Sequence, residues 1–226
     1  MSTIIFNNSF YKNLITPKYI YLHYIHRSID KYAVSTKVAD NGKNKIKTGD
    51  LRKNHIICEA IGVTEELSAC IGLAREYVLE DEKLRPVAEK LRKIQLVLID
   101  AVEIINRLQA KESRLDSSKI PELTKSAEIT CGDIADLEAL IAHYGTFLPQ
   151  IEKVLVPGGG KASAALHVAR ASCRRCERVL ISVFKDADNG KNILAYINRL
   201  SSYLFQAARI SAKFANRPES IYKPHT

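Results

Sequence analysis

Residues 161–184 read KASAALHVARASCRRCERVLISVF and contain neither glycine nor proline. Apolar side chains recur in this stretch every three or four residues, which places them on one face of an α-helix. They are Leu166, Ala169, Cys173, Cys176, Leu180 and Val183. Pro157 and the three glycines 158–160 come just before, so we expect the chain to turn there and the helix to begin near Lys161. The stretch therefore predicts a long amphipathic helix that packs by one face.

Four more segments show the same spacing. Thr64 is expected to cap the first helix, because its hydroxyl can accept a hydrogen bond from an exposed amide of the first turn. Pro86 precedes the second helix, where its missing amide does no harm. The five expected helices cover about 64–78, 87–108, 134–144, 161–184 and 192–214, and the polar residues between them are interpreted as loops. No segment alternates convincingly as a strand, so the chain is predicted to be an all-α five-helix bundle.

Composition and charge limit the class of protein. The 226 residues are 46% hydrophobic, and one main domain is expected over residues 36–226. The net charge is +9, but residues 1–58 carry +7 of it. A nearly neutral remainder excludes a phosphate-binding stripe across the fold, so we expect no nucleic-acid binding. No apolar run is long enough to span a bilayer, so no membrane insertion is expected either.

The N-terminal segment, residues 1–35, is basic, and residues 1–29 contain no aspartate or glutamate. This composition is typical of a mitochondrial transit peptide, which predicts a location in the mitochondrial matrix. A disordered basic tail is the alternative.

An arginine row lies within the helix expected over residues 161–184. Arg170, Arg174 and Arg178 recur every fourth residue, so their guanidinium groups share one face and repel one another. A bound polyanion such as a triphosphate would offset this repulsion through bidentate contacts. The alternative is a solvated face that is neutralised by Glu177 and by acids on neighbouring helices. Asn198 lies on the last expected helix beside this row and can bind either a nucleotide or a helix end.

Other motifs carry less information. The sequence PGGGK at 157–161 lacks the spacing and the Ser/Thr of a Walker A motif, so its glycines are interpreted as a turn. Cys173 and Cys176 form a CxxC pair within a helical stretch, where free cysteines pack as small apolar side chains. His167 is interpreted as a packed core residue. No cluster of His, Cys and carboxylates has the spacing of a metal site, so no metal ligands are predicted.

Four segments give the chain a resemblance to a known family. They are EAIGVTEELSACIGLARE at 59–76, KIQLVLIDA at 93–101, VLVPGGGKASAALHVARASCRRCERV at 154–179 and NRLSSYLFQAARI at 198–210. In order and spacing, the chain from Thr36 to Tyr222 resembles the PduO-type ATP:cob(I)alamin adenosyltransferases. The resemblance implies a homotrimer of five-helix bundles that binds ATP and a corrinoid between subunits. It further implies that Co(I) of cobalamin attacks the 5′ carbon of ATP, with Mg²⁺ present, and expels triphosphate. A cobalamin reductase and methylmalonyl-CoA mutase are the implied partners.

The resemblance also assigns roles to particular residues. It makes Arg174 and Arg178 the catalytic pair, because they match arginines that hold the triphosphate. Arg170 and Glu65 match a pair that forms a salt bridge between subunits. Val154 and Ser202 fall on the corrinoid side. The implied ATP-binding residues are Thr36, Lys37, Val38, Ala39, Lys53, Arg174, Arg175, Glu177, Arg178 and Asn198.

The chain departs from the family pattern at four of these positions, one of which is Val38, where family members have a threonine. Val154 stands where family members have a phenylalanine, whose ring helps to exclude the lower cobalt ligand and so gives a four-coordinate Co(II) that can be reduced. Ala39 replaces a glycine of the ATP loop, and Ser202 replaces an aspartate. These changes favour an alternative function, a catalytically weak paralogue that binds the corrinoid or ATP as an escort protein. Phe147 and Phe205 are the first candidates for a ring that replaces the missing one.

Overall fold

The computed structural model describes residues 43–46, 49–114, 116, 118, 120–151, 154–185, 190–217 and 219–223. The chain divides into two units, residues 1–41 and residues 42–226, and the description below concerns the second. The interpretation of residues 1–35 as a transit peptide therefore lies outside the described residues. The same holds for four expected ATP-binding residues, Thr36, Lys37, Val38 and Ala39.

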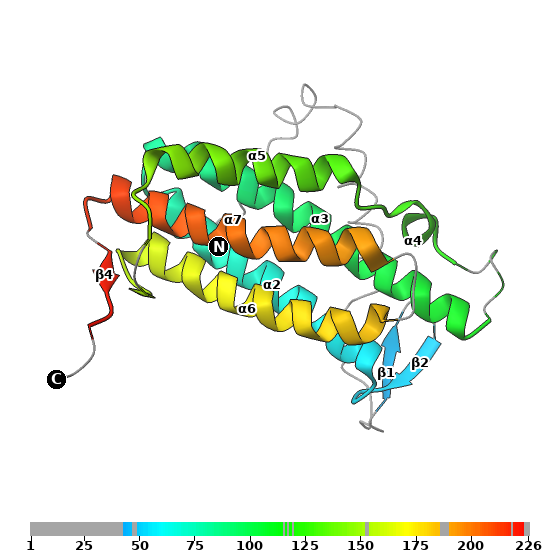
Figure 1. Cartoon of the computed structure of the whole chain (residues 1–226). Helices are drawn as coiled ribbons and strands as arrows, with labels where there is room; N and C mark the ends of the chain where they lie inside the picture. The colour runs from blue at the N-terminus through cyan, green and yellow to red at the C-terminus, as the bar shows by residue number, and fades with distance from the viewer. Residues whose placement is uncertain are drawn as a thin grey trace, which may run out of the picture. The chain divides into compact units, whose positions relative to one another are not determined.

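Five long helices run alongside one another in this unit (Figure 1). They are α2 (Ile56–Val78), α3 (Arg85–Glu112), α5 (Cys131–Phe147), α6 (Lys161–Phe184) and α7 (Lys191–Phe214). The predicted bundle of five helices is thereby confirmed. A short helix, α4 (Glu122–Ser126), and a 3₁₀ turn (Glu82–Leu84) join the long helices in regions expected to be loops. None of the described helices is apolar over a length that would cross a bilayer.

The core lies between the apolar faces of these helices. Helix α6 packs against α2 on one side and α7 on the other, while α2 also contacts α3 and α7 also contacts α5. Leucines from four helices meet in the interior: Leu67, Leu91, Leu166 and Leu200. Burial of each such side chain stabilises the fold by about 1.5–3 kcal/mol. The central place of α6 gives its outer residues a fixed position relative to α2 and α7.

The beginning of α2 differs from the prediction. The helix starts at Ile56, where the Nδ1 atom of His55 accepts a hydrogen bond from the Ile57 amide at 3.2 Å. Thr64 is instead buried in the middle of the helix, and its hydroxyl donates to the Ala60 carbonyl at 2.7 Å. The prediction that Thr64 caps the helix is wrong because a threonine hydroxyl can also bond within a helix, four residues back.

Two small sheets correct the prediction that the chain lacks strands. Strands β1 (Lys43–Ile46) and β2 (Gly49–Arg52) form an antiparallel pair just before α2, within the stretch expected to be a polar loop. Strands β3 (Leu155–Val156) and β4 (Ser220–Ile221) form a second antiparallel pair. Figure 1 shows the β1–β2 pair and β4 at opposite ends of the bundle. Strand β4 follows α7, so the end of the chain returns to the turn that precedes α6.

The glycines before α6 form the turn that the sequence predicts. Gly159 and Gly160 have φ values of +85° and +99°, a left-handed region that side chains with a Cβ avoid. A Cβ on Gly159 would also lie 2.6 Å from the Cβ of Ala212 on α7. The chain therefore turns here closely against α7, which places the start of α6 beside the end of α7.

Candidate functional site

Two exposed arginines on α6 carry unpaired positive charge. Arg174 and Arg178 lie one turn apart, and the Arg178 guanidinium donates to the Arg174 carbonyl at 3.0 Å. Within the described part of the chain, neither side chain has an ion-pair partner. The alternative, a solvated face that is neutralised by neighbouring acids, finds no such ion pair to Arg174 or Arg178 among the described residues. Two arginine forks side by side suit a polyanionic ligand.

A polar contact joins this face of α6 to α7. The Asn198 amide on α7 donates to the Glu177 carboxylate at 2.8 Å, and its Oδ1 atom accepts from Arg199 at 2.6 Å. Glu177 precedes Arg178 in the chain, so the contact lies beside the exposed arginines. The structure thus brings together four of the residues that the resemblance assigned to ATP: Arg174, Glu177, Arg178 and Asn198.

Arg175 faces the other way, toward α2. Its guanidinium forms ion pairs with Glu59, at 3.0 Å, and with Glu66. These bonds hold the pKa of Arg175 above its usual range, because both carboxylates favour the charged form. The two glutamates lie seven residues apart on α2, hence on one face, but sequence reasoning gave them no role. Arg175 therefore joins α6 to α2 within one chain.

The Arg170 side chain does not lie in one row with those of Arg174 and Arg178, as the sequence predicted. Its guanidinium lies over the ring of Phe205, 4.7 Å from the centroid, and Arg209 lies at 5.9 Å from the same ring. Burial, and then the charge of Arg174, lower the pKa of Arg170. The expectation of three guanidinium groups stacked along one face is corrected, since a cation gains more over an aromatic face than beside a like charge. The Phe205 ring therefore has two cations within 6 Å of its centroid.

His167 lies beside the same ring, with its own ring centre 6.0 Å from that of Phe205. Its Nδ1 atom is buried and has no hydrogen-bond partner among the described residues. Burial, and then the nearby Arg170, lower the pKa of His167, so the neutral form is favoured. His167 is half-buried, so it packs against Phe205 but lies outside the buried core, which corrects its interpretation as a core residue.

Three further expected site residues lie on separate elements. Lys53 is exposed in the turn between β2 and α2, and Ser202 is half-buried on α7, one turn beyond Asn198. Glu65 is exposed on α2, and desolvation raises the pKa of its carboxyl. Among the described residues, neither Glu65 nor Arg170 has an ion-pair partner within the chain. Both members of the expected intersubunit pair thus remain available to a second copy.

Val154 lies at the end of the bundle where β3 and β4 pair. Its side chain is 69% exposed, and its carbonyl accepts a hydrogen bond from the Tyr222 amide at 2.8 Å. Other large apolar side chains are exposed at the same end: Phe147, Ile151, Val156, Phe214, Ile221 and Tyr222. Such a concentration of exposed apolar surface is typical of a binding site.

Cys173 and Cys176 are both buried on α6, as the sequence predicts. Burial raises the pKa of both thiols, which keeps them protonated and unreactive. No group of three or more potential metal ligands occurs among the residues that the structure describes.

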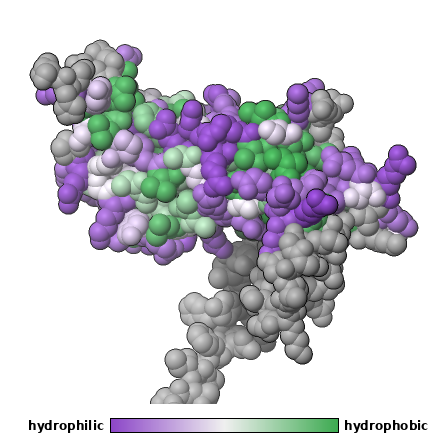
Figure 2. Space-filling view, turned by 90° about the horizontal axis from the view of Figure 1, so that it is seen from below, coloured by the Kyte–Doolittle hydropathy of each residue, from purple (hydrophilic) through white to green (hydrophobic). Residues whose placement is uncertain are grey.

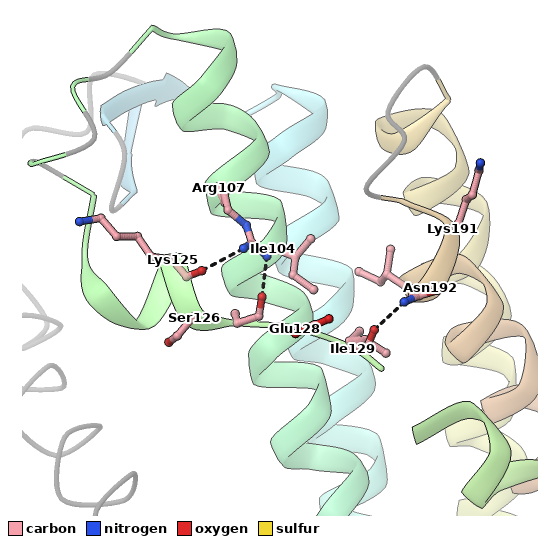
Figure 3. Close-up of a pocket in the computed structure, with 10 residues that line it drawn as sticks. Ile104, Arg107, Lys125, Ser126, Glu128, Ile129, Lys191 and Asn192 are labelled. Atoms are coloured by element: carbon pink, nitrogen blue, oxygen red, sulfur yellow. Dashed lines mark hydrogen bonds between the residues drawn. The ribbon is translucent and has the colours of Figure 1, made fainter. Parts of the chain in front are cut away.

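A cavity of about 440 Å³ lies at a different place, between α3, residues 125–129 and the start of α7 (Figure 3). Arg107 donates to the carbonyls of Lys125, at 3.0 Å, and Ala127, at 2.5 Å, while Asn192 donates to the Ile129 carbonyl at 2.9 Å. These bonds hold the end of α4 and the residues that follow it against α3 and α7. None of the residues that the sequence assigned to a site lines this cavity.

Known proteins resemble this chain over most of its length. A family model described as cobalamin adenosyltransferase matches residues 34–211. The corrinoid adenosyltransferase MMAB of Bos taurus is 38% identical over 84% of this chain and 76% of its own length. The corrinoid adenosyltransferase of Bacillus subtilis is 30% identical over 77% of this chain and 84% of its own.

Solved structures of corrinoid adenosyltransferases also resemble this chain. A variant of the PduO-type ATP:corrinoid adenosyltransferase from Lactobacillus reuteri, complexed with cobalamin and ATP, aligns with a TM-score of 0.71 at 28% identity. The alignment covers 84% of this chain and 99% of that one. Another variant of that enzyme, complexed with ATP, aligns with a TM-score of 0.70 over 84% of this chain and 100% of that one. With its helical bundle, its arginine-bearing α6 and these matches, the chain belongs to the cobalamin adenosyltransferase family.

Proposed function

We propose that this protein is a corrinoid adenosyltransferase that moves the 5′-deoxyadenosyl group of ATP onto Co(I) of cobalamin. A cobalt–carbon bond forms at the 5′ carbon while the bond from that carbon to oxygen breaks, and its electron pair leaves with the triphosphate. The observation that supports this most directly is the pair of exposed arginines on α6, Arg174 and Arg178, which have no ion-pair partner among the described residues, in a chain of this family.

The ATP side of the site is built around these arginines. Arg174 and Arg178 would hold the triphosphate and stabilise the charge that develops on it, while Asn198 and Glu177 would position the nucleotide. Lys53 and the loop of Thr36, Lys37, Val38 and Ala39 would complete the site. Mg²⁺ would enter with the triphosphate, since this ion commonly binds through substrate phosphates and keeps several waters. The cobalt supplies the nucleophile, so catalysis needs no nucleophilic side chain.

The corrinoid side would lie at the end of the bundle that carries Val154. Apolar surface suits the broad face of a macrocycle, and Ser202 and Phe205 on α7 connect this end to the ATP side. The distance between the two substrates would then be set by α6 and α7, which pack against each other along their length.

The site would be completed by a second and third copy of the chain. Helices α2 and α6 expose four large apolar side chains: Ile56, Leu73, Val168 and Ile181. Figure 2 shows hydrophobic areas between hydrophilic ones on the face seen from below. Exposed apolar patches rimmed by polar residues are typical of protein interfaces. In a homotrimer, Arg170 of one copy would pair with Glu65 of the next, which would give both side chains an ion-pair partner.

A charge reversal tests this assembly. We expect the wild-type protein to sediment as a trimer of three 25.3 kDa chains. Glu65→Arg should place like charges together, at a cost of several kcal/mol, and so favour the monomer. The double variant Glu65→Arg/Arg170→Glu should restore much of the trimer, as measured by analytical ultracentrifugation. A wild-type protein that is monomeric and fully active would contradict the shared site.

The proposal extends to where the protein acts and to its partner proteins. A basic leader on residues 1–35 would direct the protein to the mitochondrial matrix, where a cobalamin reductase would supply reduced cobalt and methylmalonyl-CoA mutase would receive the product. Import into isolated mitochondria, compared between the full chain and a chain without residues 1–35, checks the location. Equal import of both would overturn it.

One spectroscopic experiment decides the activity. The protein is mixed with Mg-ATP and chemically reduced cobalamin, and the absorbance of adenosylcobalamin is followed. We expect product to form at a rate that depends on both substrates. If the protein binds both substrates but forms no product, the function is that of an escort protein, which the replacements at Val154, Ala39 and Ser202 favour.

A further inference from the structure

Tyr222 follows strand β4 directly, and its backbone pairs with that of Val154. The register of the strand pair sets Leu155 opposite Ile221 and Val156 opposite Ser220. The hydrogen bond from the Tyr222 amide to the Val154 carbonyl, at 2.8 Å, continues this pairing by one residue. Residues directly opposite each other on antiparallel strands project to the same face, with Cβ atoms about 4.5–5.5 Å apart. The Tyr222 and Val154 side chains therefore leave the backbone from neighbouring positions on the same face.

Both side chains are open to solvent on that face. Val154 is 69% exposed and Tyr222 is 51% exposed. An aromatic side chain can bury about 150–250 Å², considerably more than valine offers. Tyr222 thus supplies most of the apolar area that this pair of residues can present to a ligand.

A buried ion pair holds the strand in place. Arg209 on α7 is only 4% exposed, and its Nε atom donates to both Glu219 carboxylate oxygens, at 3.0 and 3.2 Å. Its Nη2 atom donates to the Pro149 carbonyl at 2.9 Å. Glu219 lies three residues before Tyr222, so the end of the chain is fastened to the bundle just before the ring.

Two other rings are less suited to the same task. The Phe205 ring already has two cations near it, since the guanidinium groups of Arg170 and Arg209 lie 4.7 and 5.9 Å from its centroid. Phe147 is as exposed as Tyr222, but it lies at the end of α5, in an edge-on contact with His143 at 5.0 Å. Neither ring is placed by backbone pairing with Val154, as Tyr222 is.

We propose that the Tyr222 ring covers the lower face of the corrinoid in this protein, in place of the ring that is missing at Val154. The lower face is the one opposite the attack on ATP. A ring there excludes the axial ligand from the cobalt, which leaves a four-coordinate Co(II) that accepts an electron more readily. This proposal rests on the proposed adenosyltransferase function and names one further residue of its corrinoid site.

Assays that start from Co(II)cobalamin and from Co(I)cobalamin distinguish an effect of the ring on cobalt reduction from an effect on adenosyl transfer. We expect Tyr222→Ala to slow adenosylation from Co(II)cobalamin, in the presence of a chemical reductant, by roughly tenfold. The same variant should lose less than about threefold when Co(I) is supplied ready-made, because the reduction is then complete. Tyr222→Phe should behave as wild type in both assays. Electron paramagnetic resonance of the Co(II) complex with ATP should show less four-coordinate cobalt in Tyr222→Ala alone.

The comparison variant is Phe147→Ala, which removes a ring of equal exposure at the same end of the bundle. Any loss of rate in this variant should be the same from Co(II) and from Co(I), and the fraction of four-coordinate Co(II) should match that of the wild type. Val154→Phe should have little effect in the wild type but should recover most of the loss in Tyr222→Ala, since either ring can fill the space. Equal rates for wild type and Tyr222→Ala from Co(II), or a loss confined to Co(II) in Phe147→Ala instead, would overturn the assignment. Absence of product from Co(I) in the wild type would instead overturn the proposed function.

Discussion

Arg174→Ala and Arg178→Ala are each expected to weaken ATP binding by about 1.5–3 kcal/mol, the range for hydrogen bonds to charged groups. This corresponds to a rise in Kd of roughly ten- to hundredfold. The structure supports the expectation because both guanidinium groups are exposed and have no ion-pair partner among the described residues. Removing one of them therefore costs little within the protein, so the loss should appear in the binding of triphosphate. Isothermal titration calorimetry with Mg-ATP measures it.

Arg175→Ala is the matched control for this pair. It removes the same charge from the same helix, but from a guanidinium that already pairs with Glu59 and Glu66. Surface ion pairs of this kind contribute little to stability, so the variant should fold. The resemblance also assigns Arg175 to ATP, but its guanidinium is engaged by two carboxylates of α2, so we expect the ATP affinity of the variant to change by less than about threefold. Unchanged affinity in Arg174→Ala and Arg178→Ala would show that this face of α6 is only solvated.

Arg209→Met is expected to lower the free energy of unfolding by about 3 kcal/mol. Breaking a buried ion pair from one side costs about 3–5 kcal/mol, because the remaining charge is left without a partner. Here the Glu219 side chain is 24% exposed, so water can reach it and the cost lies at the low end of that range. The Pro149 carbonyl also loses its donor. Urea denaturation at fixed protein concentration measures the change.

Arg209→Lys and Glu219→Gln separate the contributions to this effect. Lysine keeps the charge but cannot reach both Glu219 and the Pro149 carbonyl, so we expect an intermediate loss. Glutamine keeps a hydrogen bond to Arg209 but leaves the arginine charge unpaired. If Arg209→Met is as stable as the wild type, the pair does not fasten the end of the chain, and the placement of Tyr222 must have another cause.

Local patterns predicted most of the helical fold. Helix α6 covers Lys161–Phe184, as its apolar spacing and the preceding glycines indicate, because a positive φ at Gly160 is incompatible with a helix that begins earlier. Helix α7 begins one residue before the expected start. The arginines of α6 were likewise recognisable, since a repulsive spacing of like charges is visible in the sequence.

The remaining features depend on contacts between distant residues. The β3–β4 pair joins segments about 65 residues apart, and each strand has only two residues, too few for a pattern of alternation. The partners of Arg175 lie on α2, more than 100 positions away, so their pairing arises only when α2 and α6 pack together. The ion pair of Arg209 could not be predicted either, because a single arginine in an apolar helix face does not indicate which carboxylate it will pair with.

The sequence by itself thus determined the helices, the turn before α6 and the identity of the charged residues on that helix, because each depends on neighbours within one or two turns. Only the tertiary structure determines which groups these charged side chains contact. In the packed helices, Arg175 pairs with Glu59 and Glu66, and Arg170 lies over the ring of Phe205. Arg174 and Arg178 remain exposed. Packing also brought Tyr222 beside Val154. The direction of a side chain depends on what the fold sets opposite it, and that is a property of the packed helices rather than of any one segment.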